Sequence, residues 1–215
     1  MQKKQGARLV IATLVAVLVA GTATWLFKHH STTPPATRIP TAGQPTEGHA
    51  NAPVSVVAFE DLKCQNCKNY SVGLFPTLQK KYIEPGKIRY TLIPLAFIPG
   101  SIPAANAALC LYDQKPAYFF QFVEYVYQNQ PDESIDWATT PTLLHFAAEA
   151  TPTANLKQLA TCMIELRFAS QLKANLALAG RIMKEGVMTP VVFVNGQQVH
   201  PLNQKTLMTA IENAQ

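Results

Sequence analysis

The stretch VSVVAFEDLKCQNC, residues 54–67, decides the fold of this chain. Its first six residues, 54–59, are rich in β-branched and apolar side chains and predict a buried strand. Cys64-Gln65-Asn66-Cys67 follows almost at once, and residues 64–82 are predicted to form a helix with a break near Pro76. A CxxC pair that follows a strand and opens a helix indicates a redox site.

The spacing of Cys64 and Cys67 suits thiol–disulfide exchange. Two cysteines three residues apart in a first helical turn have sulfurs on one face and within bonding reach. A helix N-terminus favours the thiolate, and Lys63 and Lys68 add positive potential. We expect Cys64, the more exposed of the two, to exchange with substrate and Cys67 to resolve the mixed disulfide.

Three other roles for the CxxC pair stay open. Half of a zinc site needs a second close pair, and Cys110 and Cys162 are far apart in the sequence. A structural crosslink over so short a loop removes little entropy from the unfolded chain. A soft-metal dithiolate lacks supporting Met or His ligands. We therefore expect neither a metal nor another cofactor at this site.

Strand patterns lie on both sides of a long helical block. Residues 88–93 predict the next strand, and apolar residues spaced i, i+3, i+4, i+7 between about 101 and 185 predict four or five helices. Residues 190–199 predict a hairpin, because Asn195-Gly196 at its centre tolerates the positive φ of a tight turn. A last amphipathic helix is expected near 202–213.

The N-terminal part predicts export. Residues 9–27 form an uncharged apolar stretch long enough to span a bilayer, and the basic leader 1–8 predicts a cytoplasmic N-terminus. The alternative is a cleaved signal peptide, cut near Gly21-Thr22-Ala23. A retained anchor is favoured because the apolar run continues past that cut. Residues 28–49, rich in Thr and Pro, are expected to be a flexible tether.

The net charge of +5 does not indicate a nucleic-acid partner. Residues 1–49 hold five basic side chains and one acidic side chain, whereas the rest of the chain holds 13 basic and 12 acidic ones. The excess therefore belongs mostly to the leader and tether. No basic stripe interleaved with aromatic residues follows, as binding to a phosphate backbone would require.

Over approximately residues 50–215, the chain resembles the DsbA-like family of bacterial thiol–disulfide oxidoreductases. The motifs that carry the resemblance are FEDLKCQNC at 59–67, AALC at 107–110 and GVMTPVVFVNG at 186–196. The resemblance implies a thioredoxin-like α/β fold built from residues 50–100 and 186–215. An all-helical subdomain, residues 101–185, would be inserted between these two parts.

The resemblance also implies roles for residues outside the CxxC. The Thr189-Pro190 bond would be cis and would lie against Cys64, facing bound substrate. Some members of the family have a structural disulfide where Cys110 and Cys162 lie, and two buried free thiols are the alternative. The substrates would be exported proteins with thiols or disulfides, and a membrane redox partner would recycle the site. The protein would lie in the bacterial inner membrane with a periplasmic domain, or free in the periplasm if the leader is cleaved.

Three features depart from the family pattern. The family often has a buried acid six residues before the first cysteine, where this chain has Ala58, and we expect the nearby Glu60 and Asp61 to point elsewhere. Met188 stands where Gly is usual. The tuning dipeptide Gln65-Asn66 can donate only neutral hydrogen bonds to a thiolate. We therefore expect a reduction potential between roughly −270 and −120 mV.

The leading hypothesis is a protein disulfide oxidoreductase that acts by dithiol–disulfide exchange. Disulfide donation is our first choice of direction, with reduction or isomerisation as the alternative. A second class is a non-catalytic binding module or metal carrier on the same fold. Its hallmark would be a missing cysteine or added Met and His ligands, and the sequence shows neither.

Overall fold

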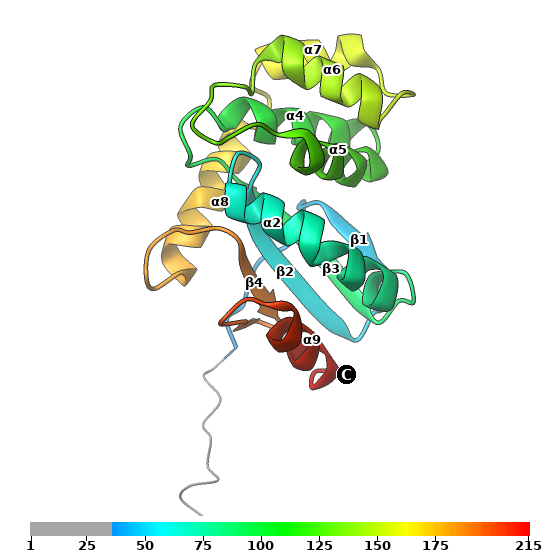
Figure 1. Cartoon of the computed structure of the whole chain (residues 1–215), viewed down its shortest axis with the longest axis vertical. Coiled ribbons are helices and arrows are strands. Elements are labelled where there is room, and N and C mark those ends of the chain that lie inside the picture. Colours follow the sequence, from blue (N-terminus) through cyan, green and yellow to red (C-terminus); the bar gives the residue numbers. More distant parts are fainter. Residues whose placement is uncertain (1–35) are drawn as a thin grey trace, which may run out of the picture. The chain divides into compact units, whose positions relative to one another are not determined.

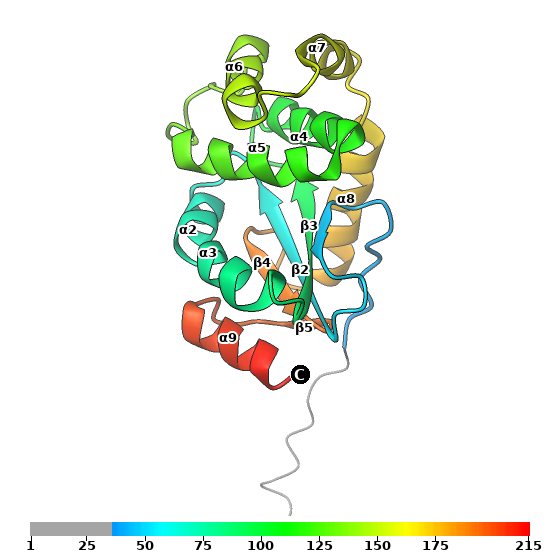
Figure 2. The same cartoon turned by 90° about the vertical axis from the view of Figure 1, so that its right-hand side faces the viewer.

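The computed structural model describes residues 36–215, which form a five-stranded mixed sheet covered by helices on both faces (Figures 1 and 2). The strand order is β1-β3-β2-β4-β5. The strands are β1 (Thr46–Gly48), β2 (Val54–Asp61), β3 (Ile88–Leu95), β4 (Val191–Val194) and β5 (Gln197–Gln198). β2 and β3 are parallel, and the other three pairs are antiparallel. The predicted hairpin is confirmed, with Asn195 and Gly196 at positive φ.

The helices follow the predicted order. They are α2 (Gln65–Gly73), α3 (Phe75–Leu78), the π-helical turn η1 (Gln79–Ile83), α4 (Ile102–Gln114), α5 (Pro116–Asn129), α6 (Thr140–Ala150), α7 (Leu156–Ile164), α8 (Ala169–Ile182) and α9 (Gln204–Glu212). The break near Pro76 is confirmed, because α2 ends at Gly73 and Pro76 lies in the first turn of α3. A proline is tolerated there, since a first-turn N–H has no partner within the helix.

Alternation along β2 divides the core between the two faces of the sheet. Val56 and Ala58 face the cluster that contains α2 and α9, and Val57 and Phe59 face the cluster that contains α8. Figure 2 shows α2, α3 and α9 on one side of the sheet and α8 on the other. Because successive side chains of a strand alternate, both faces of this central strand are buried.

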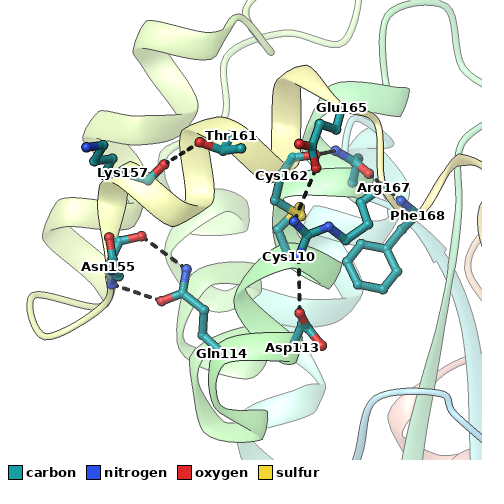
Figure 3. Close-up of a disulfide and its surroundings, with 11 residues drawn as sticks. Cys110, Asp113, Gln114, Asn155, Lys157, Thr161, Cys162, Glu165, Arg167 and Phe168 are labelled. Carbon is teal, nitrogen blue, oxygen red and sulfur yellow. Dashed lines mark hydrogen bonds and ion pairs between the residues drawn. A yellow bond between two sulfur atoms is a disulfide. The ribbon is translucent and has the colours of Figure 1, made fainter.

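The helical block α4–α7 lies over the end of the sheet at which β2 and β3 finish (Figure 1). Cys110 of α4 and Cys162 of α7 form a disulfide, and both are almost fully buried (Figure 3). Arg167 forms ion pairs with Asp113 and Glu165 beside it. These ion pairs are exposed and therefore contribute little to stability, in contrast to the covalent bond between the two helices.

The prediction of a flexible tether over residues 28–49 is wrong for the part that the structure describes. β1 pairs with β3, and the Thr37 N–H donates to the Gly196 carbonyl oxygen at 2.8 Å. The Gln44 side chain also hydrogen-bonds Asn175, at 2.6 Å. Backbone and polar side-chain bonds hold this segment, so it carries no apolar periodicity that the sequence could display. The domain therefore begins before residue 50.

The predicted leader 1–8, the apolar segment 9–27 and the first part of the tether lie outside the described residues. Within residues 36–215, none of the helices is both long enough and apolar enough to cross a bilayer.

Candidate dithiol active site

The end of β2 places Cys64 at the start of α2. The Cys64 N–H donates to the Asp61 carbonyl oxygen at 2.9 Å, and the Cys64 carbonyl accepts from the Lys68 N–H at 3.1 Å. Cys64 is the N-cap residue, and Cys67 lies in the first turn of the helix. Both thiols are free, and Cys64 is 6% exposed while Cys67 is fully buried. The sequence thus predicted correctly which cysteine is the more accessible.

The surroundings shift the pKa values of the two thiols in opposite directions. Hydrogen bonds from the Cys67 thiol, the Thr189 hydroxyl and the backbone N–H groups of Cys67 and Asn66 outweigh burial and lower the pKa of Cys64 to about 6. Burial, and then the bond to Cys64, raises the pKa of Cys67 well above its usual range. At neutral pH the pair is therefore one thiolate and one thiol, which is the form that attacks disulfides.

Thr189 and Pro190 lie against this pair. The bond between them is cis, and the Cys64 thiol donates to the Thr189 carbonyl oxygen at 3.5 Å. The Thr189 side chain is close enough to both sulfurs to lower the pKa of each cysteine. Met188 next to it is 43% exposed. The segment thus forms a wall beside the sulfurs, with an accessible apolar side chain at its outer edge.

The two lysines next to the CxxC turn away from the sulfurs. The Lys63 ammonium group donates to the Pro99 carbonyl at 3.0 Å, and that of Lys68 donates to the Gln130 carbonyl at 3.0 Å. They fasten neighbouring loops to the site. The lowered pKa of Cys64 arises from hydrogen bonds, so the local positive potential expected from these lysines is not its main cause.

Asp61 points away from the dithiol, as expected, and organises the loop after β3. Its carboxylate accepts hydrogen bonds from the N–H groups of Lys63, Phe97 and Ile98 and from the Ser101 hydroxyl, at 2.9 to 3.1 Å. Burial raises the pKa of Asp61, and these four bonds oppose the rise. The carboxylate is saturated with donors, which suits a structural role.

The expectation that Glu60 points away from the site is wrong. Glu60 is 1% exposed, and its charge contributes to the raised pKa of Cys67. One carboxyl oxygen accepts a hydrogen bond from the Tyr90 hydroxyl at 3.0 Å, and the other has no hydrogen-bond partner among residues 36–215. Burial is the main cause that raises the pKa of Glu60 to about 7. A signal for this orientation was present, because Glu60 and Ala58 are two apart on one strand and share a face.

Glu60 lies at the inner end of a cavity of about 380 Å³ between the sheet, α2 and α5. The cavity is also lined by Glu47, whose pKa burial raises to about 7. Exposed residues of α5, among them Ala117, Gln121 and Glu124, line its outer part. The cavity therefore connects a buried carboxyl group beside the dithiol with the protein surface.

Sequence reasoning also missed Glu133, in the loop between α5 and α6. Its carboxylate accepts a hydrogen bond from the Gln65 N–H at 2.8 Å, next to Cys64. The two residues are 68 positions apart in the chain. No motif or periodicity connects them, so only the fold could reveal this contact.

Three comparisons with known proteins agree on one family. A sequence model described as thioredoxin matches residues 41–213. Disulfide bond formation protein D of Bacillus subtilis (strain 168) is 32% identical over 158 residues, which cover 73% of this chain and 70% of that protein.

Solved structures show the same architecture. The crystal structure of oxidised BdbD from Bacillus subtilis has a TM-score of 0.76 and 28% identity, with coverage of 83% of this chain and 96% of that one. The crystal structure of Chlamydia trachomatis DsbA has a TM-score of 0.74 and 30% identity, with coverage of 84% and 96%. These likenesses extend through the sheet and the helical block, since they cover most of residues 36–215.

Proposed function

Because the chain belongs to the thioredoxin family, and within it to the DsbA-like thiol–disulfide oxidoreductases, we propose that Cys64 and Cys67 are its redox couple. The observation that carries this proposal is the opposite displacement of the two pKa values in one CxxC pair. A thiolate at Cys64 and a thiol at Cys67 suit a nucleophile and a resolving group. Cys64 takes the first role because it is the one that solvent reaches.

Exchange in the donating direction begins with the Cys64–Cys67 disulfide. A substrate thiolate attacks the Cys64 sulfur, the Cys64–Cys67 bond breaks, and Cys67 leaves and takes up a proton. A second substrate thiolate then attacks its neighbour's sulfur in the mixed disulfide and releases Cys64 as a thiolate. The substrate loses two electrons, which the dithiol gains. The low pKa of Cys64 makes it a good leaving group in the second step.

Glu60 exchanges this proton with Cys67 in place of the missing acid at Ala58. Its pKa of about 7 means that it can give or take a proton near neutral pH. It gives the proton to Cys67 when the disulfide opens and takes it back when the dithiol is reoxidised. Water in the cavity that runs from Glu60 to the surface completes the route to solvent.

Thr189 and Pro190 form the wall against which a substrate peptide lies. The Thr189 carbonyl lies 3.5 Å from the Cys64 sulfur, so this backbone is positioned to pair with an extended peptide next to the reacting sulfur. The exposed Met188 side chain supplies an apolar, adaptable contact for the substrate.

Donation of disulfides is the direction that the observations favour. The matched relative is named for disulfide bond formation, and a stabilised Cys64 thiolate favours the dithiol product of donation. Gln65 and Asn66 supply no charge, so the site is a milder donor than one with a histidine between the cysteines. Reduction or isomerisation is the alternative, and a reduction potential near −270 mV would favour it.

The chain acts outside the cytoplasm on exported proteins. Its dithiol product needs an oxidant, and we assign this role to a redox partner in the membrane. Residues 9–27 anchor the protein beside that partner. Alkaline extraction of membranes tests the anchor: the protein should stay in the pellet with an intact N-terminus. Recovery of a soluble form that begins just after Ala23 would show a cleaved leader instead.

Replacement of Cys67 by Ala tests the exchange chemistry. Without its resolving thiol, the variant should accumulate mixed disulfides between Cys64 and exported proteins, visible as reducible bands on gels run without reductant. A Cys64→Ala, Cys67→Ala double variant is the matched control and should form none. A Cys67→Ala sample without trapped partners, together with a wild type inert in thiol assays, would favour a binding module or metal carrier.

A further inference from the structure

A carboxylate from a distant part of the chain lies against the N-terminus of α2. The Gln65 N–H, the first of the helix, donates to Glu133 at 2.8 Å. The next backbone N–H groups, those of Asn66 and Cys67, donate hydrogen bonds to the Cys64 sulfur. The positive end of this helix is therefore shared between two anions, the Glu133 carboxylate and the Cys64 thiolate.

Hydrogen bonds on both sides of the CxxC fix the loop that carries Glu133. The Lys68 ammonium group donates to the Gln130 carbonyl at 3.0 Å, and the Gln130 amide donates to the Lys63 carbonyl at 3.2 Å. Asp132 closes a turn by accepting from the Ser134 N–H at 2.9 Å. Glu133 is thus held at the dithiol by bonds that do not involve its own side chain.

Covalent geometry keeps Glu133 close to the reacting sulfur. The Gln65 nitrogen is bonded to the carbonyl carbon of Cys64, so the carboxylate oxygen that it contacts lies within roughly 7 Å of the Cys64 sulfur. Two negative charges at this distance repel each other, because they lie within one Debye length at ordinary ionic strength. Glu133 is exposed, so the surrounding water keeps this repulsion modest. The disulfide form has no charge at Cys64, so the repulsion affects only the reduced form.

We propose that Glu133 is a positioning residue that weakens the oxidising strength of the Cys64/Cys67 couple by occupying the N-terminus of α2 beside the Cys64 thiolate. The proposal rests on the redox couple proposed above. Reduction adds two electrons and, at neutral pH, one proton, which goes to Cys67. The remaining negative charge appears at Cys64 next to Glu133, so the carboxylate shifts the equilibrium towards the disulfide.

Glu133→Gln separates charge from structure, because the amide oxygen still accepts from the Gln65 N–H. Two quantities are measured on wild type and variant: the equilibrium constant for reduction by glutathione at pH 7, and the midpoint of the Cys64 thiolate absorbance. The equilibrium constant should rise about two- to fivefold, the range for one charge at a helix terminus. The acid dissociation constant of the Cys64 thiol should rise by the same factor, so the thiolate midpoint should move to lower pH.

Glu149→Gln is the matched control, since it removes an equal charge from an exposed position on α6 and should change neither quantity. High salt should bring the equilibrium constants of Glu133→Gln and wild type closer together, because salt screens the repulsion between Glu133 and the Cys64 thiolate. An unchanged equilibrium constant and midpoint in Glu133→Gln would overturn the proposal and leave Glu133 as a helix cap. A wild type whose Cys64 and Cys67 do not equilibrate with glutathione would instead overturn the redox couple itself.

Discussion

At the scale of single residues, the site depends on how differently two neighbouring thiols are solvated. Cys67 is buried without a compensating charge, whereas Cys64 collects hydrogen bonds from Cys67, Thr189 and the start of the helix. The reduced form is therefore a thiolate paired with a thiol over a wide range of pH. The number of protons that the disulfide takes up on reduction therefore depends on pH in a way that can be measured.

The first prediction concerns the pH dependence of the reduction potential. Above about pH 6, reduction of the disulfide takes up one proton for two electrons, and below it two. The potential should fall by about 30 mV per pH unit above pH 6 and by about 59 mV per unit below it. Redox titration of the purified protein from pH 4.5 to 8 measures the slope. A single slope of about 59 mV per unit up to pH 8 would contradict a thiolate at Cys64.

The same titration affects stability with a definite sign. Folding lowers the pKa of Cys64 to about 6, and this shift stabilises the reduced protein. The stabilisation is complete when the pH is above the ordinary pKa of a cysteine thiol. That contribution is lost as the pH falls through about 6. The oxidised protein has no thiol to titrate at Cys64, so it lacks this dependence.

The second prediction concerns Glu60. Burial raises its pKa to about 7, so the folded protein is penalised when this carboxyl ionises, and its contribution to stability is lost as the pH rises through 7. Glu60→Gln should therefore change the free energy of unfolding more favourably at pH 8 than at pH 4. The difference between the two changes should be about 1–3 kcal/mol. Urea unfolding at the two pH values measures the difference. An equal effect at both would mean that Glu60 titrates normally.

The variant should also slow exchange, since Gln cannot take the proton of Cys67. Glu149→Gln, on the surface of α6, is the control and should stay within about 0.5 kcal/mol of wild type at both pH values.

At the scale of elements, a disulfide joins α4 to α7 (Figure 3). These are the first and the last helix of the block α4–α7. It closes a loop of 52 residues. Loss of this bond in a Cys110→Ala, Cys162→Ala variant should lower the free energy of unfolding by about 4 kcal/mol. Urea unfolding with the Cys64/Cys67 pair reduced in both proteins measures the loss. A loss below about 1 kcal/mol would show that packing alone holds α4 and α7 together.

Much of the element order could be predicted from the sequence, because local chemistry determines it. The strand before Cys64 is a run of β-branched and apolar residues, and Asn195-Gly196 allows few conformations other than a tight turn. Pro76 broke the predicted helix where the structure breaks it. In each case a property of adjacent residues was enough.

The features that could not be predicted depend on distant residues. β1 is short and is held by backbone pairing with β3, which leaves no side-chain pattern. The contact between Glu133 and Gln65 exists only because the α5–α6 loop returns to the start of α2. Glu60 is a different case, since the period of two along β2 could have placed it beside Ala58 on the face of the dithiol.

At the scale of the whole described region, the sheet and the helical block make separate contributions to one site. The CxxC follows the end of β2 and opens α2, the Thr189-Pro190 segment precedes β4, and Glu60 lies in β2. The block adds the loop with Glu133 and one wall of the cavity that reaches Glu60. Changes in the block can therefore tune the couple without touching either sulfur.

Transfer of one disulfide under exclusion of oxygen tests donation most directly. The protein with its Cys64–Cys67 disulfide is mixed with an equimolar, reduced and unfolded exported protein that has two cysteines, and the thiols of each are counted by mass spectrometry after alkylation. One disulfide should appear in the substrate for each pair of new thiols at Cys64 and Cys67. A substrate that keeps both thiols, or transfer that persists in a Cys64→Ala variant, would contradict a disulfide donor that works through this couple.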